Sequence, residues 1–124
     1  PTRSFNEPLG NSSLITIRDI SFYSMCEHHL LPFFGKVEIV YAPENNRIAG
    51  FSDFARIVNV YSRRLQIQER MTEQIADAIV RLLQPKGVRV TVEALQLCAA
   101  MRGEHRNNVQ TVTRCVRGSF HEDA

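Results

Sequence analysis

Cysteines and histidines are the residues of this sequence whose types and spacing could do chemistry. Cys26 and His29 are three positions apart, which lets a thiolate and an imidazole reach one metal ion from a single turn. Cys98, far downstream, could supply a third ligand, and three protein ligands would leave zinc one open position for water. Zinc with an open position lowers the pKa of its bound water, and His28 stands beside the ligands to carry protons. The pattern therefore predicts a catalytic metal site.

Other interpretations of the cysteines stay open. Cys115 competes with Cys98 as the third ligand, or could form a closed structural site with it. The same residues would also occur without a metal, if the cysteines packed in an ordinary core and the histidines lay on the surface. The spacing alone does not separate a metal site from such a core.

A strand through Cys98 would align further polar groups with it. Alternate side chains of an extended segment share a face, so Gln96, Cys98 and Arg102 would point the same way. Taken singly, Gln96 would be an ordinary solvated strand residue and Arg102 an ordinary loop charge. Beside a metal ligand, the same row places an amide and a guanidinium where a substrate would lie.

Two predicted helix starts carry groups that could hold a nucleotide. Ser52 and Arg56 are four positions apart, so a Ser52 N-cap and the Arg56 guanidinium would form a phosphate site at a helix N-terminus. Gln68 and Glu69 open a second helix, and a carboxylate that accepts paired N–H groups can read guanine. An N-cap with a solvated arginine, and acidic residues favoured by the helix dipole, are the plainer alternatives.

Hydrophobic periodicity predicts the elements that must position these residues. Alternation predicts strands, and helical spacing of apolar residues after Ser52 and around residues 71–83 predicts two amphipathic helices. The predicted strands cover residues 14–20, 35–41, 87–101 and 109–120, with a short return at 47–51. The order ββααββ favours an α+β fold, an antiparallel sheet with two helices on one face. Its open edges and uncovered face favour association with further copies.

Size and composition bound the remaining possibilities. The 124 residues fit one domain, with residues 1–13 as a flexible N-terminal arm and residues 14–124 as the single folded unit. No apolar run is long enough to span a bilayer, and the first residues do not read as a signal peptide. Three cysteines with a Cys-x-x-His pair fit a reducing compartment, so we expect a cytoplasmic protein. A formal net charge of +2 does not indicate a nucleic-acid or membrane partner.

Several blocks of the sequence together resemble GTP cyclohydrolase I. The similarity runs from about residue 14 to residue 120, and the first and third blocks are the most specific. The blocks are residues 24–33 (SMCEHHLLPF) with 35–37 (GKV), 55–58 (ARIV), 61–70 (YSRRLQIQER) and 101–103 (MRG).

The resemblance implies a tunnelling fold, a ββααββ unit that associates into an oligomeric barrel, typically a homodecamer of two pentameric rings. It implies GTP as substrate, with water added at C8, the imidazole ring opened, formate released and 7,8-dihydroneopterin triphosphate formed for pterin and folate biosynthesis. It implies active sites at subunit interfaces and Zn2+ as cofactor. The residues carried over are the metal ligands Cys26, His29 and Cys98, the proton shuttle His28, the guanine readers Gln68 and Glu69, the ribose or triphosphate contacts Ser52, Arg56 and Arg102, and Glu27 as a further substrate-binding residue.

Three departures from the family pattern qualify that expectation. Gln96 stands where the family usually has a catalytic histidine, and an amide cannot exchange a proton near neutral pH. Asp53 stands where the family usually has a lysine, and a carboxylate repels a triphosphate. The helical N-terminal region of the family has no counterpart in this sequence. One alternative is therefore a diverged paralogue acting on another purine or formamidopyrimidine nucleotide. A second is a non-catalytic metal- or nucleotide-binding assembly protein.

Overall fold

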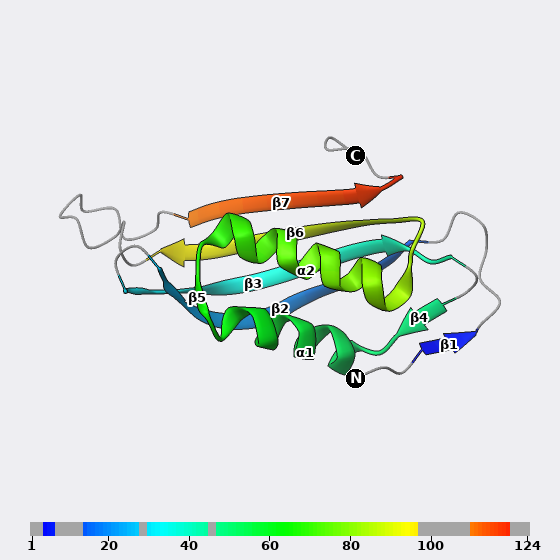
Figure 1. Ribbon diagram of the computed structural model, residues 1–124, viewed down its shortest axis with the longest axis horizontal. Helices are drawn as coiled ribbons and strands as arrows, with labels where there is room; N and C mark the ends of the chain where they lie inside the picture. The colour runs from blue at the N-terminus through cyan, green and yellow to red at the C-terminus, as the bar shows by residue number, and fades with distance from the viewer. Residues whose placement is uncertain (1–3, 7–13, 28–29, 45–46, 97–109, 120–124) are drawn as a thin grey trace.

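The computed structural model describes residues 4–6, 14–27, 30–44, 47–96 and 110–119 (Figure 1). Two helices and a five-stranded sheet make up most of the chain, and a separate two-stranded sheet lies beside them. The elements are β1 (Ser4–Asn6), β2 (Ile15–Cys26), β3 (Pro32–Ala42), β4 (Arg47–Ala49), α1 (Phe51–Ser62), β5 (Leu65–Gln66), α2 (Gln68–Leu83), β6 (Gly87–Gln96) and β7 (Gln110–Gly118).

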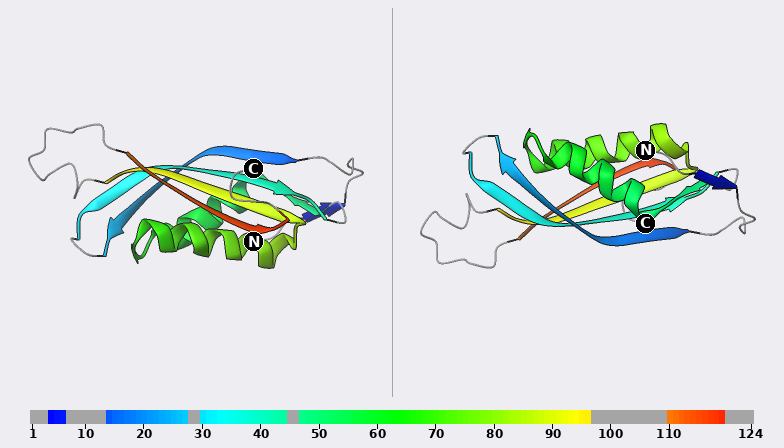
Figure 2. Two further views of the ribbon diagram at one scale, coloured as in Figure 1. Left: turned by 90° about the horizontal axis from the view of Figure 1, so that it is seen from above. Right: turned by 90° about the horizontal axis from the view of Figure 1, so that it is seen from below.

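The large sheet has the order β5-β2-β3-β6-β7. Its four long strands pair antiparallel, and only the two-residue strand β5 runs parallel to its neighbour β2. Both helices cover the same face of this sheet, and no helix or strand of the described residues covers the other face (Figure 2). The predicted α+β arrangement, with two helices on one face of an antiparallel sheet, is therefore confirmed.

The core lies between the helices and the covered face of the sheet. Both helices turn an apolar stripe inward, and alternate residues of β2, β3 and β6 meet them, as period-2 and period-3.6 patterns require. The largest fully buried apolar side chains are Tyr41, Phe33, Phe54, Ile39, Met71, Ile75, Ile79 and Leu83. This core fixes the helices against the sheet and so fixes the ends of the strands that carry the candidate site.

Strand β2 is longer than the alternation predicts, because it reaches Cys26 instead of ending at residue 20. A register shift between Ile17 and Ile20 interrupts its pairing with β3, and Asp19 there adopts a left-handed φ of 65°. The bulge breaks the simple alternation, so the sequence pattern does not predict residues 21–26 as part of the strand. Beyond it, Ser24 and Cys26 point toward the covered face and are buried.

Helix α1 begins one residue before Ser52, and its N-cap is Gly50. The prediction that Ser52 caps this helix is therefore wrong, since Ser52 lies within the first turn and is exposed. The carboxylate of Asp53, at the third helical position, instead accepts a hydrogen bond from the Gly50 N–H at 3.3 Å. Asp53 is only 4% exposed, and its carboxylate caps the start of α1 through this hydrogen bond.

Strand β1 pairs antiparallel with β4, which corresponds to the predicted short return at 47–51. β1 lies within the segment that the sequence suggests is a flexible arm, and three of those residues are therefore held by a partner strand. Among the described residues, no helix is both long enough and apolar enough to cross a membrane.

Candidate active site

The candidate metal ligand Cys26 is the last residue of β2 and opens the connection to β3. Met25 pairs with Pro32, so the chain reverses direction between them. We call the described residues of this connection, Cys26, Glu27, Leu30 and Leu31, the Cys26 turn. The Cys26 N–H donates to the Leu31 carbonyl at 2.8 Å, and the Leu30 N–H donates to the Cys26 carbonyl at 2.8 Å. Leu30 has a left-handed φ of 56°, which reverses the chain. The Cys26 side chain is 8% exposed and its thiol is free.

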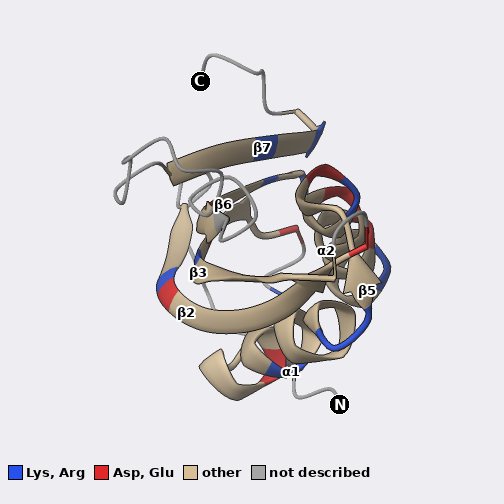
Figure 3. Ribbon diagram, turned by 90° about the vertical axis from the view of Figure 1, so that its left-hand side faces the viewer, with Lys and Arg blue, Asp and Glu red and all other residues tan. Residues whose placement is uncertain are grey.

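The sheet register brings the end of β6 to the same end of the molecule. Gln96 pairs with Phe33, which in turn pairs with Ser24, two residues before Cys26. The chain therefore leaves the sheet toward Cys98 at the end where β2 reaches Cys26. We call this end of the sheet, with β5 and the first turn of α2, the Cys26 end; it faces the viewer in Figure 3.

Several predicted site residues lie outside the described residues: His28, His29, Cys98 and Arg102. Within the described part of the chain, no group of three or more His, Cys, Asp or Glu side chains could hold a metal ion. The donor types nonetheless fit zinc, because a buried free thiol lies in a closed turn and a histidine follows it three positions later in the sequence. Cys26 is the one predicted ligand that the structure describes.

The third cysteine is far from this turn. Cys115 pairs with Val90, which pairs with Ile39, so it lies seven β3 residues away from the Pro32 level, roughly 20 Å at strand spacing. Burial raises the pKa of the Cys115 thiol above its ordinary value, and Nη1 of Arg117 donates to its Sγ at 2.7 Å. Within one chain, Cys115 therefore cannot share a metal ion with Cys26.

Strand β5 and helix α2 hold the Cys26 turn from the side. Cys26 pairs with Gln66 of β5, and the Glu27 N–H donates to the Gln66 carbonyl at 2.9 Å. The Glu27 carboxylate accepts from Nη2 of Arg70, in α2, at 2.6 Å. Glu27, which the resemblance assigns to substrate binding, therefore has an ion-pair partner within its own chain. The sequence did not single out Gln66 or Arg70; only their place in the family-like string of residues 61–70 pointed to them.

The two predicted guanine readers are next to each other but face different surroundings. Gln68 is 2% exposed, and its Nε2 donates to the Val92 carbonyl at 3.1 Å and the Thr111 carbonyl at 2.9 Å. Its amide therefore ties the start of α2 to β6 and β7. Glu69 is exposed in the same helical turn, where the helix dipole favours its carboxylate. Of the pair, Glu69 is the one whose side chain a substrate can reach.

Ser52 lies in the first turn of α1 and Arg56 near the middle of the same helix. The helix ends at Ser62, shortly before β5, so they lie about 15 Å and 9 Å along its axis from the Cys26 end. Both are exposed, and Arg56 lines a cavity of about 330 Å3 between α1 and α2. In their own chain, Ser52 and Arg56 are therefore set back along α1 from the Cys26 end.

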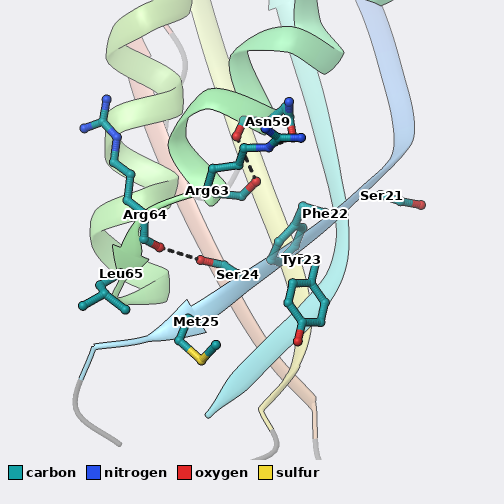
Figure 4. A pocket seen from close by; sticks show the side chains of 10 residues that line it. Ser21, Phe22, Tyr23, Ser24, Met25, Asn59, Arg63, Arg64 and Leu65 are labelled. Carbon is teal, nitrogen blue, oxygen red and sulfur yellow. Dashed lines mark hydrogen bonds between the residues drawn. The ribbon is translucent and has the colours of Figure 1, made fainter. Parts of the chain in front are cut away.

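A larger cavity of about 800 Å3 runs along β2 beside the Cys26 end (Figure 4). Residues 21–25 of β2 form one wall, and the end of α1 with the connection to β5 forms the other. Ser24 Oγ donates to the Arg64 carbonyl at 3.2 Å across it, and Arg63 Nε donates to Asn59 Oδ1 at 3.2 Å. The connection between α1 and β5 carries basic residues, drawn blue in Figure 3. The sequence alone did not predict this cavity, because its walls come from segments 40 residues apart.

The fold is that of a solved tunnelling-fold protein. The archaeosine synthase QueF-Like in its apo form matches with a TM-score of 0.73 at 17% identity, over 90% of this chain and 100% of that chain. At that identity the likeness concerns the fold alone, and it confirms the predicted tunnelling fold. The predicted oligomeric barrel stays a prediction.

Sequence comparisons are more specific. The family model described as GTP cyclohydrolase I matches residues 2–124. A GTP cyclohydrolase 1 of Deinococcus radiodurans is 54% identical over 90% of this chain and 51% of its own length. Those of Campylobacter curvus and Rattus norvegicus are 47% and 51% identical, over 100% and 91% of this chain and 66% and 46% of their own lengths. The chain spans about half to two thirds of these relatives, and it belongs to the GTP cyclohydrolase I family.

Proposed function

We propose that this chain acts in a zinc-dependent hydrolase that opens the imidazole ring of GTP at C8, releases formate and forms 7,8-dihydroneopterin triphosphate. The observation that carries the proposal is the Cys26 end, where the buried thiol residue Cys26 pairs with Gln66 of β5, three residues before the exposed Glu69 in the first turn of α2. Membership of the GTP cyclohydrolase I family supports GTP as the substrate.

In this proposal Cys26, His29 and Cys98 hold the metal ion. When bound, zinc supplies a Lewis acid at neutral pH for the water that adds to C8. C8 is a poor electrophile until N7 is protonated, so the reaction also needs a group that moves protons. His28, next to the ligands in sequence, is the residue we assign to that task.

The start of α2 orients the purine. The Glu69 carboxylate accepts the paired N–H groups of guanine and so directs C8 toward the metal side of the site. Gln68 serves the same purpose indirectly, because its amide already bonds to β6 and β7 and holds this turn in place. Arg102, like His28, belongs to the proposed site on the strength of the resemblance.

A second copy of the chain completes the site. Ser52 and Arg56 are exposed and set back along α1 from the Cys26 end, so we assign them to the triphosphate of a site in a neighbouring copy. β7, at one end of the strand order, and β2, next to the short β5 at the other, offer edges through which copies can pair. We propose a homo-oligomer, a decamer by the family resemblance, that works in the cytoplasm.

A second candidate function rests on Gln96. Its position in the family usually holds a histidine, so the same fold could act on another purine or a formamidopyrimidine nucleotide that needs one proton carrier fewer. Asp53 no longer favours this candidate, because its buried carboxylate accepts the Gly50 N–H at the helix end. Faster formate release from GTP by the Gln96→His variant, many-fold above a slow unmodified protein, would support the second candidate function. Equal rates of formate release in the two proteins would exclude it.

The proposed function is tested by loading the protein with zinc, measuring bound metal, and following formate and pterin fluorescence after GTP is added. Formate release with a fluorescent pterin product is the expected result. Bound metal with neither formate nor pterin would sink the proposal.

A further inference from the structure

We propose that Arg70 is a positioning residue that ties the Cys26 turn to the first turn of α2, and so sets the distance between the metal ligand and the purine-binding carboxylate. This inference rests on the proposed function, since it concerns the geometry of the same site. It names a residue that neither binds substrate nor holds metal.

The guanidinium of Arg70 contacts three residues at the Cys26 end, one in the Cys26 turn and two in β5. Nη2 donates to Oε1 of Glu27 at 2.6 Å and to the Leu65 carbonyl at 3.2 Å. Nε donates to Oε1 of Gln66 at 3.2 Å. A planar guanidinium presents its donors at fixed angles, so three partners fix its plane relative to both the turn and β5.

Gln66 extends these contacts into the molecule. Its side chain is 1% exposed, and Nε2 donates to the Tyr61 carbonyl at 2.7 Å and to Gln74 Oε1 at 2.9 Å. Its own carbonyl accepts the Glu27 N–H. The end of α1, strand β5, the Cys26 turn and the body of α2 therefore meet at Gln66, and Arg70 joins this buried centre to Glu27.

The remaining ion pairs of the described residues lack this arrangement. Arg18–Glu38 and Lys36–Asp19 join neighbouring strands of the open face at 3.4 Å and 3.8 Å, and Lys86–Glu44 spans 3.9 Å. Arg117 also has three partners, Asp77 of α2 at 2.9 Å and, in its own strand β7, Cys115 and the Val116 carbonyl, but these lie away from the Cys26 end. Half-exposed ion pairs add little to stability, so the consequence of the Arg70 contacts is geometric.

The expected consequence follows from where Arg70 sits in the chain. It is next to Glu69 in α2, and its partner Glu27 is next to Cys26. The Arg70–Glu27 ion pair therefore joins the neighbour of the purine-binding residue to the neighbour of the metal ligand. Without it, the turn can shift relative to α2 while the core and the helices stay folded, and a shift of about 1 Å costs much of the rate.

The test compares Arg70→Met with Arg70→Lys and with Arg81→Met. Arg81 is the matched control, an arginine on the same helix whose Nη2 donates to the Tyr61 hydroxyl at 3.1 Å, away from the turn. Each variant is loaded with cobalt(II), whose visible absorption reports thiolate ligation, and is assayed for formate release from GTP.

Arg70→Met should lower kcat about tenfold or more with KM for GTP little changed. It should also shift or broaden the cobalt bands and weaken cobalt binding about tenfold. Arg70→Lys should recover part of each effect, because an ammonium still reaches Glu27.

Two results would overturn the inference. One is a cobalt spectrum and kcat for Arg70→Met that equal those of Arg81→Met. The other is a lower rate that follows only a lower folded fraction, with unchanged cobalt bands in the protein that remains folded. Failure of the proposed function looks different: the unmodified protein would bind cobalt and release no formate from GTP, and the cobalt bands of the variants would still decide whether Arg70 positions the turn.

Discussion

At the Cys26 end, polar groups bond to one another across four elements, whereas the functional candidates Ser52 and Arg56, in the first half of α1, are exposed. The first end holds a hydrogen-bonded network, built on the buried Gln66 and the half-exposed Arg70–Glu27 pair, that lies within one chain. The second has a local cap, in which Asp53 accepts the Gly50 N–H, and two exposed side chains. The contrast supports our proposal that one chain supplies the metal-binding and purine-binding parts of the site and that a neighbouring copy supplies the phosphate-binding part.

The two described cysteines give the largest expected difference. Cys26→Ala should abolish zinc binding and reduce formate release to background, because it removes a ligand from the Cys26 turn. Cys115→Ala should keep both, since Cys115 lies in the middle of β7. Metal content by atomic emission and formate release measure this. Loss of zinc in the Cys115 variant and not in the Cys26 variant would reverse the assignment.

Two glycines compare the packing of the two ends. A Cβ at Gly35 would overlap the main chain of Glu93 and Ala94 in β6, so Gly35→Ala should cost about 3 kcal/mol of unfolding free energy. Gly50 at the start of α1 has open space around a Cβ, and Gly50→Ala should cost about 1 kcal/mol or less, as a change of N-cap. Urea unfolding of both variants measures the difference. Equal losses of unfolding free energy would mean that β3 and β6 move apart enough to accommodate the added Cβ at position 35 without strain.

Neighbouring residues of α2 separate support from substrate contact. Gln68→Met should cost about 2 kcal/mol of unfolding free energy, because the Val92 and Thr111 carbonyls lose a buried donor. Glu69→Gln should leave stability within about 0.5 kcal/mol, as exposed substitutions usually do, and should raise KM for GTP. Thermal unfolding together with KM values checks the pair. A stable Gln68→Met protein with a raised KM would return Gln68 to the role of guanine reader.

The smallest expected effect is the alkaline behaviour of Cys115. Burial raises the pKa of this thiol, so the folded protein favours its neutral form. The resulting stabilisation is complete below about pH 8.5, the usual pKa of an unfolded thiol, and is lost as pH rises through the higher folded pKa. Between pH 7 and 10, the melting temperature of Cys115→Ala should therefore fall less steeply than that of the unmodified protein. Parallel curves of melting temperature against pH for the two proteins would show that the Cys115 thiol does not contribute to the pH dependence of stability.

The sequence predicted the strands and helices that follow simple periodicity and missed those that tertiary contacts decide. β6 and β7 alternate cleanly and were predicted within the described residues, whereas the bulge at Asp19 hid the second half of β2. β5 is two residues long and exists only because Leu65 and Gln66 lie against Met25 and Cys26. No local pattern specifies such a pairing.

The same distinction holds for the candidate site. The spacing of Cys26 and His29 pointed to the turn, and the structure confirms that Cys26 lies in one. The Arg70–Glu27 ion pair joins residues 43 positions apart, and the Gln68 amide bonds to carbonyls on two strands that follow it. Spacing within a segment can indicate a ligand, but which carboxylate is paired and which is exposed depends on strand register.

The most direct measurement mixes two defective variants. Cys26→Ala lacks the Cys26 end of the proposed site, and Arg56→Ala lacks the phosphate-binding part at α1. If each site combines the two parts from neighbouring copies, an assembly from equal amounts should release formate from GTP at about a quarter of the unmodified rate, although each variant alone is near background. A verified mixed assembly that is no faster than its two components would contradict the proposed division of the site between copies.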